Sequence, residues 1–240
     1  MASATKLCDY DSTIIFISET LLSSIEKIDL RTWYRKEHFE FYKTFKQPFF
    51  NVCATVNVAK TLSYCKENQL SFFICSLFLL GYSANQIAPF RLRINGDEVD
   101  VHDDVDISCT VLNKDESFSF CAFGACHDFR LFYQQAEQRL ARIKNGHKSL
   151  APLTVSHNKI FCSVLPWLHF TSFSHAQKHN EHDSIPRIVM GKYKAFAHET
   201  LMPVSVEVHH ALVDGLHVGQ YFQQLEHNFK HFFANYGRYK

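Results

Sequence analysis

Apolar and polar residues alternate over residues 202–209, close to the C-terminal end of the chain. Such alternation predicts a β-strand with one apolar and one polar face. The two faces carry Val204, Val206 and Val208 on one side, and Ser205 and Glu207 on the other. Continuing the alternation places His210 on the valine face, aimed at packed interior, and His209 on the polar face. A histidine in a partly dry site can be a neutral general base near neutral pH.

An Asp-Gly pair, Asp214-Gly215, follows the two histidines and precedes a predicted helix over residues 216–233. Asp is a favoured N-cap residue and Gly permits a tight turn, so the pair has a simple structural explanation. Asp214 could instead be a buried carboxylate that braces the surroundings of His210. The spacing alone favours neither role.

Elsewhere, apolar periodicity predicts helices and strands interspersed along the chain. Helical spacing covers residues 58–68, 71–86 and 129–143, and the last of these helices ends at Asn145-Gly146. Strands are predicted at residues 106–112 and 117–123, joined as a hairpin, and at residues 160–165 and 188–193. This order predicts an α/β fold, a two-layer sandwich in which helices pack on a mixed sheet.

The chain has 240 residues and a formal net charge of +1. This length suits one well-buried domain, and no shift in composition marks a second. The near-neutral charge gives no reason to expect nucleic acid or an anionic membrane as a partner. The most apolar stretch, residues 71–80, is too short to span a bilayer, so a soluble protein is expected. Its 23 Phe and 10 Tyr suggest pockets lined by aromatic rings.

Eight cysteines are scattered along the chain without C-x-x-C or other metal-ligand spacing. The sequence therefore argues against a zinc site, and without a disulfide pattern or a signal peptide we expect a cytoplasmic protein. One metal-like cluster combines three histidines with two acidic residues: His175, His179 and His182 with Glu181 and Asp183. A solvated loop with incidental histidines explains this cluster better, and no metal cofactor is expected.

Three sequence blocks resemble the trimeric chloramphenicol acetyltransferases. His209-His210-x-x-x-Asp214-Gly215 resembles their signature, which dihydrolipoyl acyltransferase cores and peptide-synthetase condensation domains also carry. The residues from Trp33 to Tyr42 resemble the family's W-x-R-[KR]-E-H-F-E-x-[FY] opening, and Ser163-Val164-Leu165-Pro166-Trp167 resembles its S-A-x-P-W segment. The order and spacing of these blocks match from about Ile28 to the C-terminus. The chain is thus identified as a member of this family, and not of the hexapeptide-repeat type.

The resemblance implies a large mixed sheet backed by helices and a homotrimer with active sites between subunits. It places a single acetyltransferase domain at residues 28–240 and leaves residues 1–27 as an N-terminal extension of unknown role. It also implies chloramphenicol as acceptor and acetyl-CoA as cosubstrate. In the trimer, His210 of one subunit is expected to face Tyr42 and Phe118 of its neighbour.

The same resemblance suggests catalytic roles for two residues and a supporting role for two more. His210 would be the base that removes the proton of the drug's primary hydroxyl, while His209 would be structural. Ser163 would donate a hydrogen bond to the tetrahedral oxyanion, although a strand serine more often bonds a backbone carbonyl. Arg35 and Asp214 would form a buried ion pair that supports the site, and removing either partner alone would be costly.

Two further sets of residues match substrate-binding positions of the family. The residues expected at the chloramphenicol site are Phe41, Tyr42, Phe50, Thr110 and Phe118. Core packing is the alternative explanation for each Phe. Trp167 and Tyr193 match positions beside the coenzyme A tunnel, and an exposed phenol at a strand end would also be ordinary for Tyr193.

Four residues depart from the family pattern near the expected acceptor pocket. Val189 replaces a threonine that helps to hold a water near the oxyanion, Phe120 replaces a small residue, and Phe161 replaces a polar one. Arg187 stands where an aliphatic side chain meets the drug, so it should turn away or pair with Glu181 or Asp183. On this basis Arg187→Ile should lower the Michaelis constant for chloramphenicol with little change in maximal rate.

Three alternatives to chloramphenicol acetylation remain open. The first is an acetyltransferase for another small hydroxyl or thiol compound, which the four departures allow. The second is a dihydrolipoyl acyltransferase, disfavoured because no lipoyl domain or Pro/Ala-rich linker precedes the core. The third is a catalytically idle homologue that binds a ligand, although it would have no physical reason to retain His210, Ser163, Arg35 and Asp214.

Overall fold

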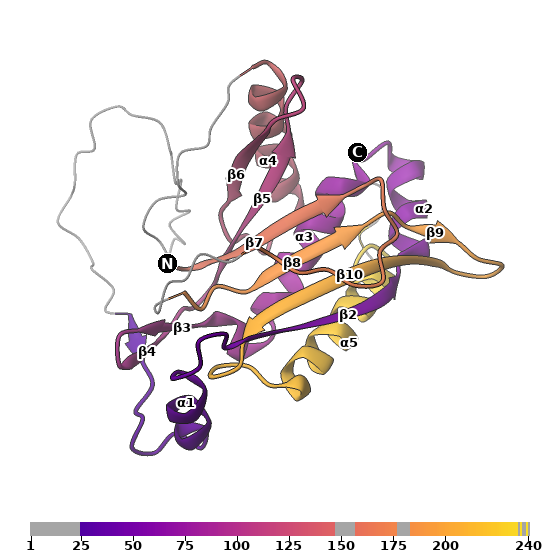
Figure 1. The fold of residues 1–240 in the computed structure, drawn as a ribbon. Coiled ribbons are helices and arrows are strands. Elements are labelled where there is room, and N and C mark those ends of the chain that lie inside the picture. Colours follow the sequence, from indigo (N-terminus) through magenta and orange to yellow (C-terminus); the bar gives the residue numbers. More distant parts are fainter. Residues whose placement is uncertain (1–24, 147–156, 177–182, 235, 237–238, 240) are drawn as a thin grey trace, which may run out of the picture.

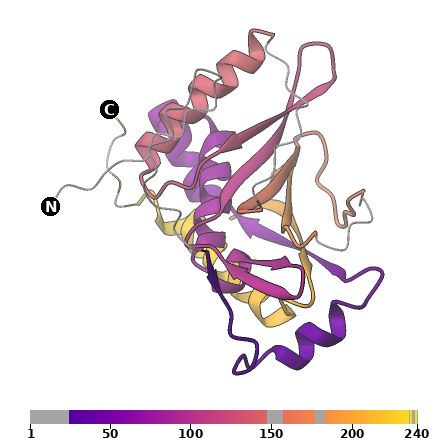
Figure 2. The same cartoon turned by 90° about the vertical axis from the view of Figure 1, so that its left-hand side faces the viewer.

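A computed structural model describes residues 25–146, 157–176, 183–234, 236 and 239. It contains two layers, a large mixed β-sheet and a set of helices packed on one of its faces (Figure 1). Figure 2, which turns the molecule by 90°, shows helices on one side of the strands. The predicted α/β two-layer sandwich with a large mixed sheet is confirmed.

The large sheet has seven strands, and its main path runs β2-β10-β8-β7-β5-β6, with β9 paired to β10. Its strands are β2 (Phe49–Asn57), β5 (Asp106–Leu112), β6 (Phe118–Phe123), β7 (Lys159–Leu165), β8 (Arg187–Gly191), β9 (Lys194–Ala195) and β10 (Thr200–His209). The β5–β7 and β7–β8 pairs are parallel, while β10 is antiparallel to both of its long neighbours. The carboxyl end of β10 therefore lies at one end of the strands, and the carboxyl ends of β7 and β8 lie at the other end.

Four helices pack together with the sheet: α2 (Ala59–Asn68), α3 (Phe72–Asn85), α4 (Phe129–Lys144) and α5 (Gly215–His231). Helix α3 is apolar nearly all round and almost wholly buried, because it lies between α5, α4 and strand β5. Ser71 caps its N-terminus by accepting the Ile74 N–H. Helix α4 buries one apolar stripe, as its 3.6-residue periodicity predicts. Asp128 caps its N-terminus.

The remaining elements form a smaller unit at one end of the molecule (Figure 1). A three-stranded sheet has the order β1-β4-β3, with bounds β1 (Glu26–Lys27), β4 (Glu98–Val101) and β3 (Leu92–Asn95). A 3₁₀ helix (Ala88–Arg91) precedes β3, and α1 (Lys36–Tyr42) follows β1. Residues 26 and 27, placed in the extension by sequence, pair with β4 here. Residues 1–24 lie outside the described part of the chain.

The structure corrects two predicted strands. Strand β10 is buried on both faces, since Ser205 and Glu207 are as inaccessible as the valines between them. The prediction of a polar face was wrong because β10 is an inner strand whose second face is also covered. Strand β8 ends at Gly191, so Tyr193 lies beyond it, in the link to β9.

Candidate active site

His210 lies just after β10, in a turn of residues 210–214 that we call the histidine turn. Its imidazole stacks on the Tyr42 ring, with centroids 3.9 Å apart and an interplanar angle of 6°. The Phe50 ring lies 4.6 Å from it, also centroid to centroid. The His210 side chain is 31% exposed. Tyr42 thus belongs to the same chain as the His210 it contacts, which contradicts the expectation that it faces a neighbour's histidine.

The predicted burial of the two histidines was the wrong way round. His209 is the more buried of the pair, with its ring edge against Phe49. The strand ends at His209, so its alternation does not extend to His210, which leaves the sheet with the turn. Burial, then the charges of His210 and Arg187, lower the pKa of His209 to about 4. His209 is therefore neutral at ordinary pH.

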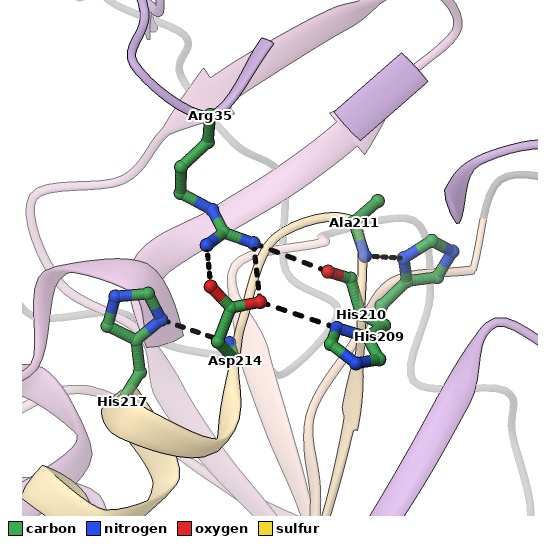
Figure 3. A network of polar contacts seen from close by, with 6 residues as sticks. All are labelled: Arg35, His209, His210, Ala211, Asp214 and His217. Carbon is green, nitrogen blue, oxygen red and sulfur yellow. Dashed lines mark hydrogen bonds and ion pairs between the residues drawn. The ribbon is translucent and has the colours of Figure 1, made fainter. Parts of the chain in front are cut away.

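Arg35 and Asp214 form the ion pair expected from the sequence (Figure 3). Nη1 of Arg35 bonds one carboxylate oxygen, Nη2 donates to the other at 3.0 Å, and Nη2 also donates to the His210 carbonyl at 3.3 Å. Asp214 is at the same time the N-cap residue of α5, as its simple structural explanation predicts. Its carboxylate pairs with Arg35 but is 30% exposed, so it is only partly buried. Burial alone would raise the Asp214 pKa, but the Arg35 hydrogen bond and charge outweigh it and lower the pKa below its usual value.

Asp214 also lies beside the ring of His210. Its Oδ1 is 3.4 Å from Nδ1 of His210, close enough for attraction but without hydrogen-bond geometry in the described structure. A carboxylate at this nitrogen favours the tautomer that carries its proton on Nδ1. That tautomer leaves the lone pair of Nε2 free to accept a proton.

His217 is a residue of this site that sequence reasoning missed. Its Nδ1 accepts a hydrogen bond from the Asp214 backbone N–H at 3.0 Å, and its side chain is buried in the first turn of α5 (Figure 3). The spacing from Asp214 to His217 is that of an N-cap and an N3 residue, as in a capping box. A histidine at N3 is uncommon in that motif. The three-residue spacing from Asp214 was therefore the only feature of the sequence that could have indicated His217.

Ser163 lies on the face of the sheet that the helices leave uncovered, next to Thr110. Cys109 and Cys162 are paired between β5 and β7, and Thr110 and Ser163 follow them by one residue. The Ser163 hydroxyl is partly accessible and has no hydrogen-bond partner within the described ranges. The alternative of a hydroxyl bonded to a backbone carbonyl is therefore not observed there.

A cavity of about 540 Å³ opens at this end of the sheet, between helices α3 and α4 and the ends of β5 and β7. Thr110 and Trp167, both predicted site residues, line it together with Ser71 and Lys144. Phe118 and Tyr193 do not line it. Phe118 is half exposed at the hairpin end, and the Tyr193 ring lies 5.3 Å from that of Phe72, centroid to centroid.

The sheet register separates Ser163 from His210 within one chain. Ser163 pairs with Val189, and Val189 pairs with Ser205, so these three residues form one row across the sheet. Ser163 is thus two strand spacings, about 10 Å, from Ser205, and His210 is about 16 Å farther along β10. The two offsets are perpendicular, so together they give a separation of about 19 Å, too far for both side chains to reach one reacting group. The predicted site residues therefore form two groups, one around His210 and one around Ser163.

Metal-binding arrangements are a separate question. No group of three or more His, Cys, Asp or Glu residues in the described ranges could hold a metal ion. Of the metal-like cluster in the sequence, His179, Glu181 and His182 lie outside those ranges, and the expected absence of a metal stays a prediction. None of the helices in the described part is long and apolar enough to cross a membrane.

A family model for chloramphenicol acetyltransferase matches residues 24–226 of the chain. The chain belongs to the chloramphenicol acetyltransferase family. The family assignment made from the three sequence blocks is thereby confirmed.

Individual relatives agree with this assignment. Chloramphenicol acetyltransferase 3 of Escherichia coli is 29% identical over 201 residues, which cover 83% of this chain and 94% of the relative. The Bacillus pumilus chloramphenicol acetyltransferase is 28% identical over 198 residues, covering 82% and 90%. A solved chloramphenicol acetyltransferase superposes with a TM-score of 0.75 at 26% identity, covering 85% of this chain and 99% of that one.

A wider fold relationship reaches the acyltransferases of 2-oxoacid dehydrogenase complexes. A probable dihydrolipoamide acetyltransferase from Listeria monocytogenes superposes with a TM-score of 0.59 at 13% identity, covering 81% of this chain and 88% of that one. This likeness concerns the fold alone. The higher score and identity of the chloramphenicol acetyltransferase neighbour favour that family over the dihydrolipoyl acyltransferases.

Arg187, one of the four departures from the family pattern, is paired as expected. Its guanidinium contacts Asp183, lies 3.1 Å from Oε1 of Glu207, and stacks 4.5 Å above the Phe49 ring centroid. Asp183 was one of the two proposed partners, while Glu181 lies outside the described residues. Glu207 was missed because it stands directly across from Arg187 on β10, and a sequence does not show which strands pair. The charge is neutralised by its partners and does not project into an apolar pocket.

Proposed function

We propose that this protein transfers an acetyl group from acetyl-CoA to the primary hydroxyl of chloramphenicol. The observation that carries the proposal is the setting of His210, whose partly exposed ring is fixed by Tyr42 on its face and by Asp214 beside Nδ1. Membership of the chloramphenicol acetyltransferase family supports the choice of substrates. The alternative of another small hydroxyl or thiol acceptor is kept as an outcome of the test below.

In the proposed reaction, His210 acts as general base. Its Nε2 accepts the proton of the acceptor hydroxyl while that oxygen attacks the thioester carbonyl carbon of acetyl-CoA. Collapse of the tetrahedral intermediate breaks the carbon–sulfur bond, and protonated His210 returns its proton to the departing thiolate. The products are the acetyl ester and free coenzyme A. Arg35 and Asp214 support this step by fixing the backbone and ring of His210.

Ser163 is proposed to stabilise the negative charge of the tetrahedral intermediate. Its hydroxyl is free to donate because no described residue engages it. A donor fixed at a developing oxyanion contributes about 3 kcal/mol to lowering the barrier. Val189, level with Ser163 on the next strand, offers no hydroxyl to hold a water there.

The acetyl-CoA arm is proposed to enter along the cavity between α3 and α4, at the same end of the sheet as Ser163 but on its helix-covered face. Trp167 and Thr110 line this cavity, and Lys144 and Glu137 place one positive and one negative charge in its wall. Tyr193, edge-to-face with Phe72 outside the cavity, is proposed to contact a more distant part of coenzyme A. Phe50, beside His210, and Phe41, edge-to-face with Tyr42, are proposed to contact the drug, together with Tyr42.

Two copies of the chain are needed to complete such a site, and we propose a homotrimer. His210 and Ser163 are about 19 Å apart in one chain, so the Ser163 group must come from a neighbouring chain. Exposed aromatic side chains mark both ends, with Phe41 and Phe45 on the His210 side and Phe118 on the hairpin. A second copy would cover such apolar surface. Phe118, but not Tyr42, is then the residue expected to face a neighbour's His210.

We further propose that the protein acts in the cytoplasm, where it inactivates the antibiotic and confers resistance to it. All seven cysteines in the described part of the chain are free, which suits a reducing compartment. Five of them are buried in the core as small apolar side chains: Cys65, Cys75, Cys109, Cys121 and Cys162.

The test is thiol release from acetyl-CoA, measured with chloramphenicol and with several other small hydroxyl and thiol compounds. Release that depends strictly on chloramphenicol, with the acetyl ester identified by mass spectrometry, is the expected result. Turnover with another compound and none with chloramphenicol would establish the alternative acceptor. No turnover with any acceptor, from a folded protein that still binds coenzyme A, would support the idle homologue and overturn the proposal.

A further inference from the structure

The histidine turn satisfies all five of its backbone N–H groups within the protein. Three bond to backbone carbonyls: His210 to Pro48 at 2.8 Å, and Leu212 and Val213 to His209 at 3.0 Å each. The other two donate to imidazole rings: Ala211 to Nδ1 of His209 at 3.2 Å, and Asp214 to Nδ1 of His217 at 3.0 Å (Figure 3). Because the residues of this turn are largely buried, water does not readily replace a lost acceptor.

We propose that His209 and His217 are positioning residues, two neutral imidazoles that hold the histidine turn from either end and so place His210 and Asp214. The proposal rests on the acetyltransferase function proposed above. His209 precedes the turn at the end of β10, and His217 follows it in the first turn of α5. Together they fix the backbone on both sides of the proposed base.

Each contact requires one protonation state. An Nδ1 that accepts an N–H bond must carry a lone pair, so the proton of the neutral ring is on Nε2. Protonating Nδ1 would set one N–H group against another and remove the acceptor. The turn would then lose a bond at that end, and Asp214 would lose the backbone contact that orients it toward Arg35 and His210.

Burial, with the charged groups around the two rings, keeps them neutral. Burial and then Arg35 lower the pKa of His217, against the opposing effect of Asp214. At His209, burial acts first and His210 and Arg187 add to it. Arg187 is itself paired with Asp183 and Glu207, and His175 lies within the influence of the same pair. Both rings thus remain acceptors at the pH where His210 would act as base.

The acid side of the pH–rate profile should report the state of His217. Burial and Arg35 lower the pKa of His217, and once its Nδ1 is protonated the turn is released. The His217 acceptor should therefore contribute to the fall of kcat/KM at the acid end. Replacing His217 by Gln keeps an acceptor at the N3 position but removes its titration.

The kinetic test compares His217→Ala and His217→Gln with the parent, and uses His227→Ala, an exposed histidine on the same helix, as control. We expect His217→Ala to lower kcat about 10-fold or more with the Michaelis constant for acetyl-CoA nearly unchanged, since misplaced groups lose rate rather than binding. His217→Gln should recover most of kcat, with an acid limb shallower than that of the parent. Equal kcat in His217→Ala and the parent would overturn the positioning role.

A second measurement does not depend on activity. Hydrogen–deuterium exchange of a peptide covering residues 209–216 should be faster in His217→Ala than in the parent, and unchanged in His217→Gln and His227→Ala. Unchanged exchange in a folded His217→Ala would overturn the proposal. If His217→Ala does not fold, fast exchange in His217→Gln would overturn it, and parent-like exchange would support it. The expected exchange pattern in a protein that acetylates nothing would instead leave this inference standing and overturn the proposed function.

Discussion

The two ends of the large sheet differ in how completely one chain builds them. Around His210, Tyr42 stacks on the ring, Arg35 and Asp214 form an ion pair, and every N–H of the histidine turn is satisfied. Around Ser163 the hydroxyl has no partner in the described structure, the cavity is open and Trp167 is largely exposed. One end is preorganised within the chain, and the other is the end that we propose substrate and a neighbouring subunit complete.

Because of this difference, we expect mutations at the two ends to have different effects on stability and rate. Groups at the His210 end are interlocked, so most substitutions there change both stability and geometry. Groups at the Ser163 end contact little within the chain, so substitutions there should change the rate and leave the fold intact. Nε2 of His210 is the atom at this end whose loss should affect the rate most directly, while the ring that carries it also packs on Tyr42 and Phe50.

The largest effect is expected for His210→Ala. Removing the proposed general base should lower kcat by about 10²–10⁴-fold, because no other described group can take the hydroxyl proton at that position. Thiol release at saturating acetyl-CoA, compared at matched folded fraction by circular dichroism, measures the effect. Parent-like turnover in a folded His210→Ala would exclude the mechanism.

The next effect is expected for Ser163→Ala. Loss of one oxyanion donor should lower kcat by about 10²–10³-fold without a change in thermal stability. Kinetics with chloramphenicol and a melting curve test both halves of this statement. A large loss of stability would show instead that the hydroxyl is a structural contact.

Mixing these two variants tests the separation of the ends directly. If His210 and Ser163 of different chains meet, refolding His210→Ala with Ser163→Ala at equal amounts should restore about one quarter of the sites, since each intact site takes one residue from each variant. Refolding each variant alone provides the control and should restore nothing. A mixture that also stays inactive would place both residues of a site in one chain, against the register of the sheet.

Much of the fold follows from short-range pattern in the sequence. Helix α4 and the β5–β6 hairpin have the bounds that their periodicity predicts to within one or two residues, because each is defined by an uninterrupted amphipathic stretch and a cap or turn. Strand β2 was missed. Its adjacent Phe49 and Phe50 break strict alternation, and as an edge strand it is only partly buried.

The parts of the site that could not be predicted depend on contacts between distant segments. Tyr42 meets His210 across 168 positions of the chain, and Glu207 meets Arg187 only because β8 and β10 are neighbours. The burial of His209 depends likewise on the residues that cover the second face of β10. The Arg35–Asp214 pair was found in advance only because two sequence blocks resembled a known family.

The Arg187 cluster provides a test between stability and binding. Because Glu207 and Asp183 surround the guanidinium, Arg187→Ile should now destabilise the protein by about 3 kcal/mol, since it removes the cation that faces the buried Glu207 carboxylate. This replaces the earlier expectation that Arg187→Ile mainly lowers the Michaelis constant. Urea unfolding of Arg187→Ile, and of Arg187→Ile combined with Glu207→Gln, measures it. The double variant should recover part of the loss, and an unchanged single variant would contradict the ion pairing.

The last expected effect concerns pH and again involves the His210 end. Well above pH 6.5, His209 is neutral in the folded and unfolded states and its titration changes nothing. As the pH falls from about 6.5 to about 4, the unfolded chain takes up a proton that the folded state refuses, because the folded pKa is about 4. The free energy of unfolding should therefore fall by about 3 kcal/mol across this window, before Asp214 begins to titrate.

His209→Asn, whose Oδ1 can replace Nδ1 as acceptor for Ala211, should flatten this decline, while the exposed His227→Asn should not. Urea unfolding at half-unit pH steps measures the slopes, and equal slopes in His209→Asn and the parent would show that His209 does not hold its end of the turn as a neutral ring.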